Sequence, residues 1–484
     1  MTRINFTWNG RPLSGEVGDT LAEALSRNGE HILARTRKHH RPLGVSGSYT
    51  AGTLARVDGR PHVRLDVEPL VEGVRVEMQN AWPTPAFDVL SLARLVPSRW
   101  LWAGFEHGRL TPSAGWAYHL WDRTLSWLAG VGEAPAAGQG QMPPPAAVVD
   151  LDVLVVGGGP AGISSANAAA AQGKTVGLVT RGDGLARFAV AMGAEPVPVH
   201  PTVQIFTGIE VFGAYQDGQL LVGASPRHSG RAILFRPAQT ILATGRRSIP
   251  PLVPGSHLPG VMDAQTAVIS AHKAKLHPGK AVAVVGAGDQ AAVAERLRGL
   301  GGNVIHTGAV ADLHAVKGRN HVRAIVLSNG RTVACDAVVH AGPWQTDRGL
   351  LFQARAEGDL QLDDRPGMAP ISLAGDAAKA DQPLPVPPRI TPDTLVCPCM
   401  DVSAGELLAH IDAGVDDPEV LKRLTSCGMG PCQGWPCWNS MIALLAARTD
   451  RDPALFRRPS ARAPRRALTV AQAATLWDVV EVER

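Results

Sequence analysis

The chain has 484 residues, of which 45% are hydrophobic and 19% are charged, and its formal net charge is +4. This length allows about three domains, and so weak a charge does not indicate a nucleic-acid partner. No run of about 18 apolar residues is free of charge, so we expect no membrane span, and the N-terminus lacks the apolar core of a secretory signal. Five of the six cysteines fall between Cys397 and Cys437, which indicates metal binding in a reducing compartment, the cytoplasm, rather than disulfides.

Residues 1–80 predict a small β-rich module. Residues 4–8 alternate in polarity, and Asn9 and Gly10 then supply a hairpin turn before a second strand. We expect a helix over 20–28 with Asp19 as its N-cap and Gly29 at its end. Further short strands are expected over 63–67 and 74–78. Residues 81–149 predict an extended arm, rich in Trp, Pro and Leu and packed on other domains over 81 to about 130, and then a linker over 131–149.

The segment 150–380 predicts an α/β domain pair, because apolar strands alternate with glycine turns and helices. The buried strand 151–156 leads into a G-x-G-x-x-G motif at Gly157, Gly159 and Gly162, and Pro160 and Ala161 open the following helix. The first glycine permits a tight turn, the second admits a pyrophosphate, and the third allows helix and strand to pack closely. The free N–H groups of the helix would face the phosphates. We therefore predict a dinucleotide site here, although a purely structural turn is the alternative.

The second strand of this unit ends without the acid that binds ribose hydroxyls. Thr180 stands at that position and Arg181 follows it. A hydroxyl makes one hydrogen bond but cannot accept two, whereas Arg181 would favour a phosphorylated ribose. The identity of the nucleotide, and even its presence, is therefore left open by the sequence.

A second strand–glycine–helix unit has the variant G-x-G-x-x-A at 286–291. Asp289 in that turn would repel a pyrophosphate, so a nucleotide fold without nucleotide is an equal alternative. Two further motifs end strands with small residues. Thr244 and Gly245 mark a crossing between the two domains, and Gly375 with Asp376 would place a carboxylate near a flavin ribityl chain.

Residues 391–445 predict a cluster-binding domain. Cys397 and Cys399 are followed after 27 residues by Cys427 and Cys432, and four thiolates from two loops can hold a [2Fe–2S] cluster. Zinc also accepts four thiolates, but zinc sites more often use C-x2-C pairs, so the C-x-C half favours iron–sulfur. Nearby glycines would let backbone amides turn towards sulfur. Ser403 is expected to cap a helix over 404–413 that Gly414 ends.

Cys437 is a fifth thiol, for which a buried free cysteine is a more common role than an alternative ligand. Residues 446–484 form a basic tail, for which a solvated segment is more typical than a partner-binding patch. Its arginines are Arg457, Arg458, Arg462, Arg465 and Arg466.

Three segments together resemble a known family. Residues 425–437 (TSCGMGPCQGWPC), 250–262 (PPLVPGSHLPGVM) and 37–44 (RKHHRPLG) are similar to segments of the α subunits of heteromeric FAD-dependent amine and amino-acid dehydrogenases. These include the D-hydroxyproline, opine and proline dehydrogenases, hydrogen cyanide synthase and the α subunit of sarcosine oxidase. The resemblance covers most of the chain outside 81–149 and the tail.

The resemblance implies a two-dinucleotide-binding-domain flavoprotein fold with an N-terminal ferredoxin-like β-grasp module and a small C-terminal helical [2Fe–2S] domain. It also implies a division of labour. A β subunit, itself a flavoprotein, would dehydrogenate the amine, and this chain would pass electrons through its cluster to an acceptor. FAD, and FMN at the subunit boundary, would be the flavins. No amine-oxidising residue can be carried onto this chain.

Two departures from the family pattern matter. The N-terminal module has no cysteine, and residues 45–50 (VSGSYT) occupy the loop where ligands would lie, so it predicts a scaffold. The segment after Thr180 is also short. Two alternatives to the α-subunit hypothesis therefore stay open: a self-sufficient NAD(P)H-dependent flavoprotein reductase, and a non-catalytic structural subunit with a degenerate nucleotide site.

Overall fold

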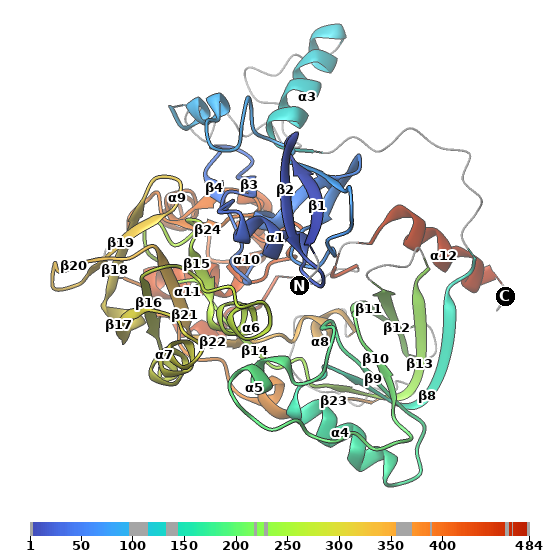
Figure 1. Ribbon diagram of the computed structural model, residues 1–484. Coiled ribbons are helices and arrows are strands. Elements are labelled where there is room, and N and C mark those ends of the chain that lie inside the picture. The colour runs from blue at the N-terminus through green and yellow to red at the C-terminus, as the bar shows by residue number, and fades with distance from the viewer. Residues whose placement is uncertain are drawn as a thin grey trace.

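The structure is a computed structural model that describes residues 3–95, 115–131, 144–216, 220–226, 231–354, 370–387, 390–459, 464–466 and 468–481. The chain forms an N-terminal β module, two α/β domains and a C-terminal helical unit (Figure 1). Within these residues no helix has the length and apolar character needed to cross a membrane.

The N-terminal module is a mixed five-stranded sheet of order β2-β1-β7-β5-β6 against which one helix packs. Asn9 and Gly10 both have positive φ, 49° and 78°, and they form the predicted hairpin turn. One predicted strand lies earlier than expected, at Arg60–Arg64 rather than 63–67. The elements are β1 Arg3–Trp8, β2 Arg11–Glu16, α1 Leu21–Arg27, β3 Ala34–Arg35, β4 Pro42–Leu43, β5 Leu54–Val57, β6 Arg60–Arg64 and β7 Arg75–Glu77.

Helix α1 is capped by Thr20 and not by Asp19, so that prediction was wrong by one residue. The Thr20 hydroxyl accepts from the Glu23 amide at 3.2 Å, and the Glu23 carboxylate accepts from the Thr20 amide at 2.8 Å. This reciprocal capping box satisfies two amides that have no partner within the helix. Asp19 instead accepts from Arg27 at 2.8 Å, a partner that a local cap motif does not reveal.

The first α/β domain is built on a seven-stranded sheet of order β10-β9-β8-β13-β12-β11, with β23 beside β13. The inner half of β8 is buried on both faces, as expected for an apolar strand in a parallel sheet. Helix α4 follows the glycine turn directly. The elements are β8 Ala147–Val156, α4 Pro160–Ala170, β9 Val176–Val179, α5 Arg187–Ala191, β10 Gln204–Phe206, β11 Ile209–Gln216, β12 Leu220–Pro226, β13 Ile233–Leu242, α8 Gly349–Ala354 and β23 Ile371–Leu373.

The second α/β domain holds a parallel four-stranded sheet of order β15-β21-β16-β17 and an antiparallel three-stranded sheet. The pair β14–β22 connects it to the first domain (Figure 1). The elements are β14 Arg246–Ser248, β15 Val261–Asp263, α6 Ala264–Ala274, β16 Val282–Gly286, α7 Gln290–Gly299, β17 Val304–Ala309, β18 Leu313–Gly318, β19 Val322–Leu327, β20 Thr332–Ala334, β21 Ala337–Ala341 and β22 Trp344–Thr346. These domains confirm the predicted fold class.

The C-terminal unit packs three helices around the cysteine loops. Ser403 caps α9 in a second capping box with Glu406, and Gly414, at φ 95°, follows its end, so the predicted helix is confirmed.

Of the arm over 81–149, helix α3 is described, and residues 96–114 and 132–143 lie outside the described residues. The elements are α3 Trp116–Leu128, β24 Leu395–Cys397, β25 Val402–Ser403, α9 Ala404–Asp412, α10 Pro418–Thr425, α11 Cys437–Thr449 and α12 Val470–Glu481.

Candidate functional site

Five cysteine side chains meet in the core of the C-terminal unit. Cys397 ends β24, Cys399 lies in the turn to β25, Cys427 follows α10, and Cys432 precedes α11, whose first residue is Cys437. All five are buried, and none is more than 4% exposed. The sulfurs of Cys397, Cys427 and Cys437 lie within 4.8 Å of one another, and the Cys399 and Cys432 sulfurs are 3.3 Å apart. The structure therefore brings the four predicted ligands together and adds Cys437.

Two glycines fix the loop that carries Cys427 and Cys432. Gly428 has φ 84°, and a Cβ there would lie 1.8 Å from the Trp438 indole nitrogen. Its amide donates to the Cys397 sulfur at 3.5 Å, which is the predicted turn of a glycine amide towards sulfur. A Cβ on Gly430 would lie 2.3 Å from the Cys399 Cβ. Both positions therefore require glycine if the thiols are to approach one another this closely.

The donor set is entirely sulfur, as in the four-cysteine sites that hold most [2Fe–2S] clusters. Hydrogen bonds from the Cys427 and Cys437 thiols lower the pKa of Cys397 well below that of an ordinary thiol, whereas contacts with neighbouring sulfurs, together with burial, raise the pKa of each of the other four thiols. A metal centre displaces the protons of the thiols that bind it, so the fit rests on the closeness of five buried sulfurs. Four sulfurs of this set suffice for a [2Fe–2S] cluster.

The glycine motif adopts the backbone that a nucleotide turn needs. Gly157 has φ 119°, and a Cβ there would lie 2.2 Å from the Ala243 carbonyl oxygen. A Cβ on Gly162 would lie 1.9 Å from the Gly157 carbonyl oxygen, so helix and strand touch at this point. Gly159 caps α4, and nothing lies within 4 Å of its Cβ position. The three glycines thus provide the turn, the close packing and the open approach that the motif predicts.

A cavity of about 620 Å³ opens beside this motif. It also receives Arg246, whose guanidinium pairs with Asp376 at 3.3 Å and with Asp289 at 3.7 Å. Of the ten predicted nucleotide residues, Ala161, Gly162 and Gly375 do not line this cavity. Those that line it are Gly157, Gly159, Pro160, Thr180, Thr244, Gly245 and Asp376.

The short segment after Thr180 folds back over the glycine turn. The Ala186 amide donates to the Gly158 carbonyl at 2.7 Å, and a Cβ on Gly158 would lie 2.7 Å from the Leu185 side chain. The Thr180 hydroxyl accepts from the Gly182 amide at 3.4 Å. This loop therefore fills the space beside the position where an acid binds ribose in dinucleotide folds.

The basic tail is not a solvated segment, so that prediction was wrong. Arg465 is 5% exposed and pairs with Asp347 at 3.1 Å. Arg466 pairs with Glu210 at 3.2 Å and with Asp347 at 3.4 Å. Arg458 donates to Asn439 at 2.6 Å. Arg457 is exposed, and Arg462 lies outside the described residues.

Sequence reasoning missed that Arg465 and Arg466 reach the nucleotide cavity, which both of them line. The sequence feature that could have revealed this contact is the position of the two acids that pair with these arginines. Glu210 is the second residue of a largely apolar strand, and Asp347 follows a buried one. Such acids need cationic partners when they are buried.

The motif at 37–44 docks the N-terminal module on the cysteine unit. Asp401, 1% exposed, accepts from the amides of Lys38 and His39 at 3.2 and 2.7 Å and pairs with Arg41 at 3.3 Å. Lys38 also pairs with Glu406 at 2.9 Å. The module without cysteines therefore holds the loop that carries Cys399.

Comparison with known proteins agrees with these observations. A family model described as "2Fe-2S iron-sulfur cluster binding domain" matches residues 1–81, and one described as "Pyridine nucleotide-disulphide oxidoreductase" matches residues 151–307. Residues 1–81 contain no cysteine, so the first match describes the fold of the module. The matched domain types and the cysteine group in the C-terminal unit support the predicted cofactors, a [2Fe–2S] cluster and FAD.

Similar proteins include subunits of heteromeric oxidases. The alpha subunit of sarcosine oxidase from Rhizobium meliloti (strain 1021) is 29% identical over 392 residues, and the match covers 71% of this chain but 38% of that protein. An opine oxidase subunit from the same organism is 40% identical over 68 residues, 14% of this chain and 15% of that one. The chain thus spans well under two thirds of these relatives.

A solved structure shares the fold over nearly the whole chain. L-proline dehydrogenase from P. horikoshii superposes with a TM-score of 0.73 at 19% identity, over 97% of both chains. The chain therefore resembles the α subunits of heteromeric FAD-dependent amine and amino-acid dehydrogenases and has the fold of a flavin-dependent oxidoreductase.

Proposed function

We propose that the chain is the electron-transfer α subunit of a heteromeric flavin-dependent amine or amino-acid dehydrogenase or oxidase. Its role is to relay electrons from a partner flavoprotein subunit, which carries the amine-oxidising site, to an acceptor. The proposed cluster ligands are Cys397, Cys399, Cys427 and Cys432. A [2Fe–2S] cluster transfers single electrons, and FAD, with FMN at the subunit boundary, would supply them.

One observation carries this proposal: Arg466 links the buried sulfur group to the cavity beside the glycine motif. Cys432 lines a second cavity of about 290 Å³, and its carbonyl accepts from Arg466 at 3.4 Å. Arg466 also lines the nucleotide cavity. Arg466 would thus contact both the loop of a centre at the cysteines and the cavity of a flavin at the glycine motif.

The experiment is to express the chain together with a candidate partner flavoprotein and then to add amine without oxygen. We expect a flavin absorption band and a cluster whose paramagnetic signal appears on reduction by amine only when both proteins are present. A colourless, zinc-containing chain, or a cluster that amine and partner leave oxidised, would contradict the proposal.

A structural subunit with a degenerate nucleotide site is the second candidate, favoured by the loop that packs Leu185 against Gly158. The same preparation separates the two. Flavin bound in a one-to-one ratio to the isolated chain supports the relay, and a flavin-free chain supports the structural role. Rapid reduction of that flavin by NAD(P)H alone would instead indicate a self-sufficient reductase. The cysteines argue against this alternative, because Cys335 is the single cysteine outside the 397–437 group and so the flavin segments have no redox-active cysteine pair.

A further inference from the structure

Two cavities meet at a wall of arginines. The smaller cavity lies between α1 and the second α/β domain, and the larger lies beside the glycine motif. Of the described residues, six line both cavities, and none of the six is acidic. They are Arg181, Arg187, Arg247, Gln265, Ile269 and Arg466.

Three of these arginines form ion pairs with carboxylates that also pair with other cations. Glu210 pairs with Arg466 at 3.2 Å and Arg181 at 3.8 Å, and it also pairs with Arg64 at 2.8 Å. The third, Arg187, pairs with Asp183 at 3.0 Å, which also binds Lys273. Asp347 is shared in the same way, between Arg465 at 3.1 Å and Arg466 at 3.4 Å. Each of these three carboxylates thus faces at least two cations.

Arg247 is the wall arginine without a direct partner. Its guanidinium has no hydrogen bond or ion pair within the described part of the chain, and burial lowers its pKa even though the charges of Asp347, Asp263 and Glu210 oppose that shift. The positive charge of Arg247, together with burial, lowers the pKa of the neighbouring Arg181 to about 9. Grouped cations in a partly desolvated wall cost free energy unless an anion joins them. Arginine is also the side chain best suited to bidentate contact with phosphate.

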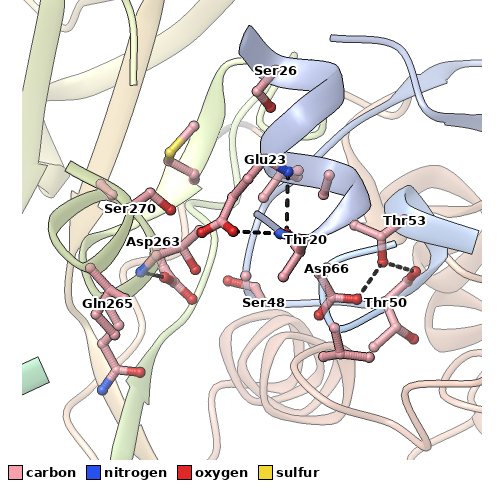
Figure 2. A pocket seen from close by; sticks show the side chains of 18 of the residues that line it. Thr20, Glu23, Ser26, Ser48, Thr50, Thr53, Asp66, Asp263, Gln265 and Ser270 are labelled. Atoms are coloured by element: carbon pink, nitrogen blue, oxygen red, sulfur yellow. Dashed lines mark hydrogen bonds between the residues drawn. The ribbon is translucent and has the colours of Figure 1, made fainter. Parts of the chain in front are cut away.

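Away from this wall, the smaller cavity is lined by hydroxyl and carboxyl groups interspersed with apolar side chains such as Leu33 and Met262. Figure 2 shows Thr20, the N-cap of α1, and Glu23 and Ser26 within this helix facing Asp263 and Ser270 of the second domain across the cavity. Thr53 and Asp66, joined by a hydrogen bond of 3.0 Å, line another side. The hydroxyl and carboxyl groups of this lining can hydrogen-bond a ligand that carries several hydroxyl groups, such as a sugar.

We propose that this junction binds the phosphate monoester of a sugar phosphate, with Arg181, Arg247 and Arg466 on the phosphate and the hydroxyl-lined cavity on the sugar. The site does not depend on the electron-relay role. FAD has a pyrophosphate but no phosphate monoester, so FAD bound at the glycine motif would not fill this site. The ligand is therefore either an additional sugar phosphate or a nucleotide whose ribose is phosphorylated.

The test is calorimetric titration of the purified full chain with pairs that differ only in the monoester. The pairs are ribose 5-phosphate against ribose, AMP against adenosine, and NADP⁺ against NAD⁺, with inorganic phosphate alone as the fourth probe. We expect the phosphorylated member of at least one pair to bind at least tenfold more tightly. A preference in the NADP⁺ pair alone would identify a phosphorylated nucleotide as the source, and a preference for ribose 5-phosphate would identify a free sugar phosphate.

Variants then locate the site. Arg247→Gln should abolish the tenfold preference, and Arg247→Lys, which keeps the charge, should retain part of it. Arg75→Gln is the matched control, because Arg75 is 76% exposed on the N-terminal module. Arg181→Gln provides a second loss variant if Arg247→Gln does not fold, as judged by circular dichroism. Equal affinity within every pair, or a preference that survives both Gln variants, would overturn the proposal.

Discussion

Cys427 and Cys437 are both buried thiols close to Cys397, yet we expect them to differ in role. Cys427→Ser should remove the visible and paramagnetic signals of the cluster, because a hydroxyl replaces one of four thiolate ligands. Cys335→Ser, at a buried cysteine of the second α/β domain, is the control and should leave both signals unchanged. Full retention of the signals in Cys427→Ser would exclude Cys427 as a ligand.

Cys437→Ser is expected to retain the cluster if the fifth thiol is only a neighbour. The measurement is iron and acid-labile sulfide per chain together with the paramagnetic spectrum. Loss of iron comparable to that in Cys427→Ser would instead place Cys437 in the ligand set. The spacing of the first four cysteines sufficed to predict them, whereas the position of Cys437 depends on how α11 begins.

Glu210 links stability to pH. Burial opposes its ionisation, but Arg64, Arg466 and Arg181 outweigh burial and lower its pKa from 4.5 to about 2. The unfolded chain therefore takes up a proton near pH 4.5 while the folded chain does not, and stability falls as pH drops from above 4.5 towards 2. By pH 4 the loss from this group is about 1 kcal/mol.

The check is urea unfolding followed by tryptophan fluorescence at pH 6, 5 and 4. Glu210→Gln should be less stable at pH 6 and should depend less on pH over this range. Glu77→Gln, at an exposed position of β7, should behave like the unaltered chain. Identical pH slopes for Glu210→Gln and the unaltered chain would contradict the assignment.

At the scale of elements, the glycine turn makes distinct demands at its second and third glycines. Gly162→Ala would force a methyl group against the Gly157 carbonyl, so we expect a loss of about 1–3 kcal/mol in unfolding free energy together with loss of flavin. Gly159→Ala has room for its methyl group and should keep stability while weakening flavin binding. Urea midpoints and flavin absorbance per chain measure the two effects. Equal destabilisation by both variants would refute this distinction.

Elements whose signals are local could be predicted from the sequence. The hairpin at Asn9 and Gly10 and helix α9 between Ser403 and Gly414 depend on residues within a few positions of one another. The cap of α1 was missed because Asp19 and Thr20 are both cap-forming types, and the choice between them rests on Arg27. The glycine turn was predicted, but the loop that returns over Gly158 was not, since Ala186 and Leu185 carry no motif.

At the scale of the whole molecule, Asp401 joins the N-terminal module to the cysteine unit. Asp401→Ala would leave the Lys38 and His39 amides and Arg41 without their buried acceptor, so we expect a loss of about 3 kcal/mol and lower iron content. Asp416→Ala is the control, because Asp416 is 66% exposed and its pair with Arg451 should contribute less than about 1 kcal/mol. Urea unfolding and iron analysis measure the result. Equal stability of the two variants would show that the docking contact contributes little.

Long-range pairing is the part of the site that the sequence could not reveal. More than 100 residues separate Arg465 from Asp347, and more than 250 separate Arg466 from Glu210. A cluster of arginines near one end of a chain is typical of an exposed segment, and only the fold shows which acids face it. The same holds for Arg247, because only the fold shows that its guanidinium pairs with no carboxylate in the described part of the chain.

The return of the C-terminal segment has a consequence for synthesis. The Thr475 hydroxyl accepts from the Ala232 amide at 3.1 Å, its carbonyl accepts from the Ala146 amide at 2.9 Å, and Arg465 and Arg466 form part of the wall of the nucleotide cavity. The glycine turn leaves the ribosome more than 300 residues before these partners. A nascent chain can therefore form the sheet and the turn early, but its cavity stays open until residues 464–475 emerge. Cofactor loading is thus expected to follow translation rather than accompany it.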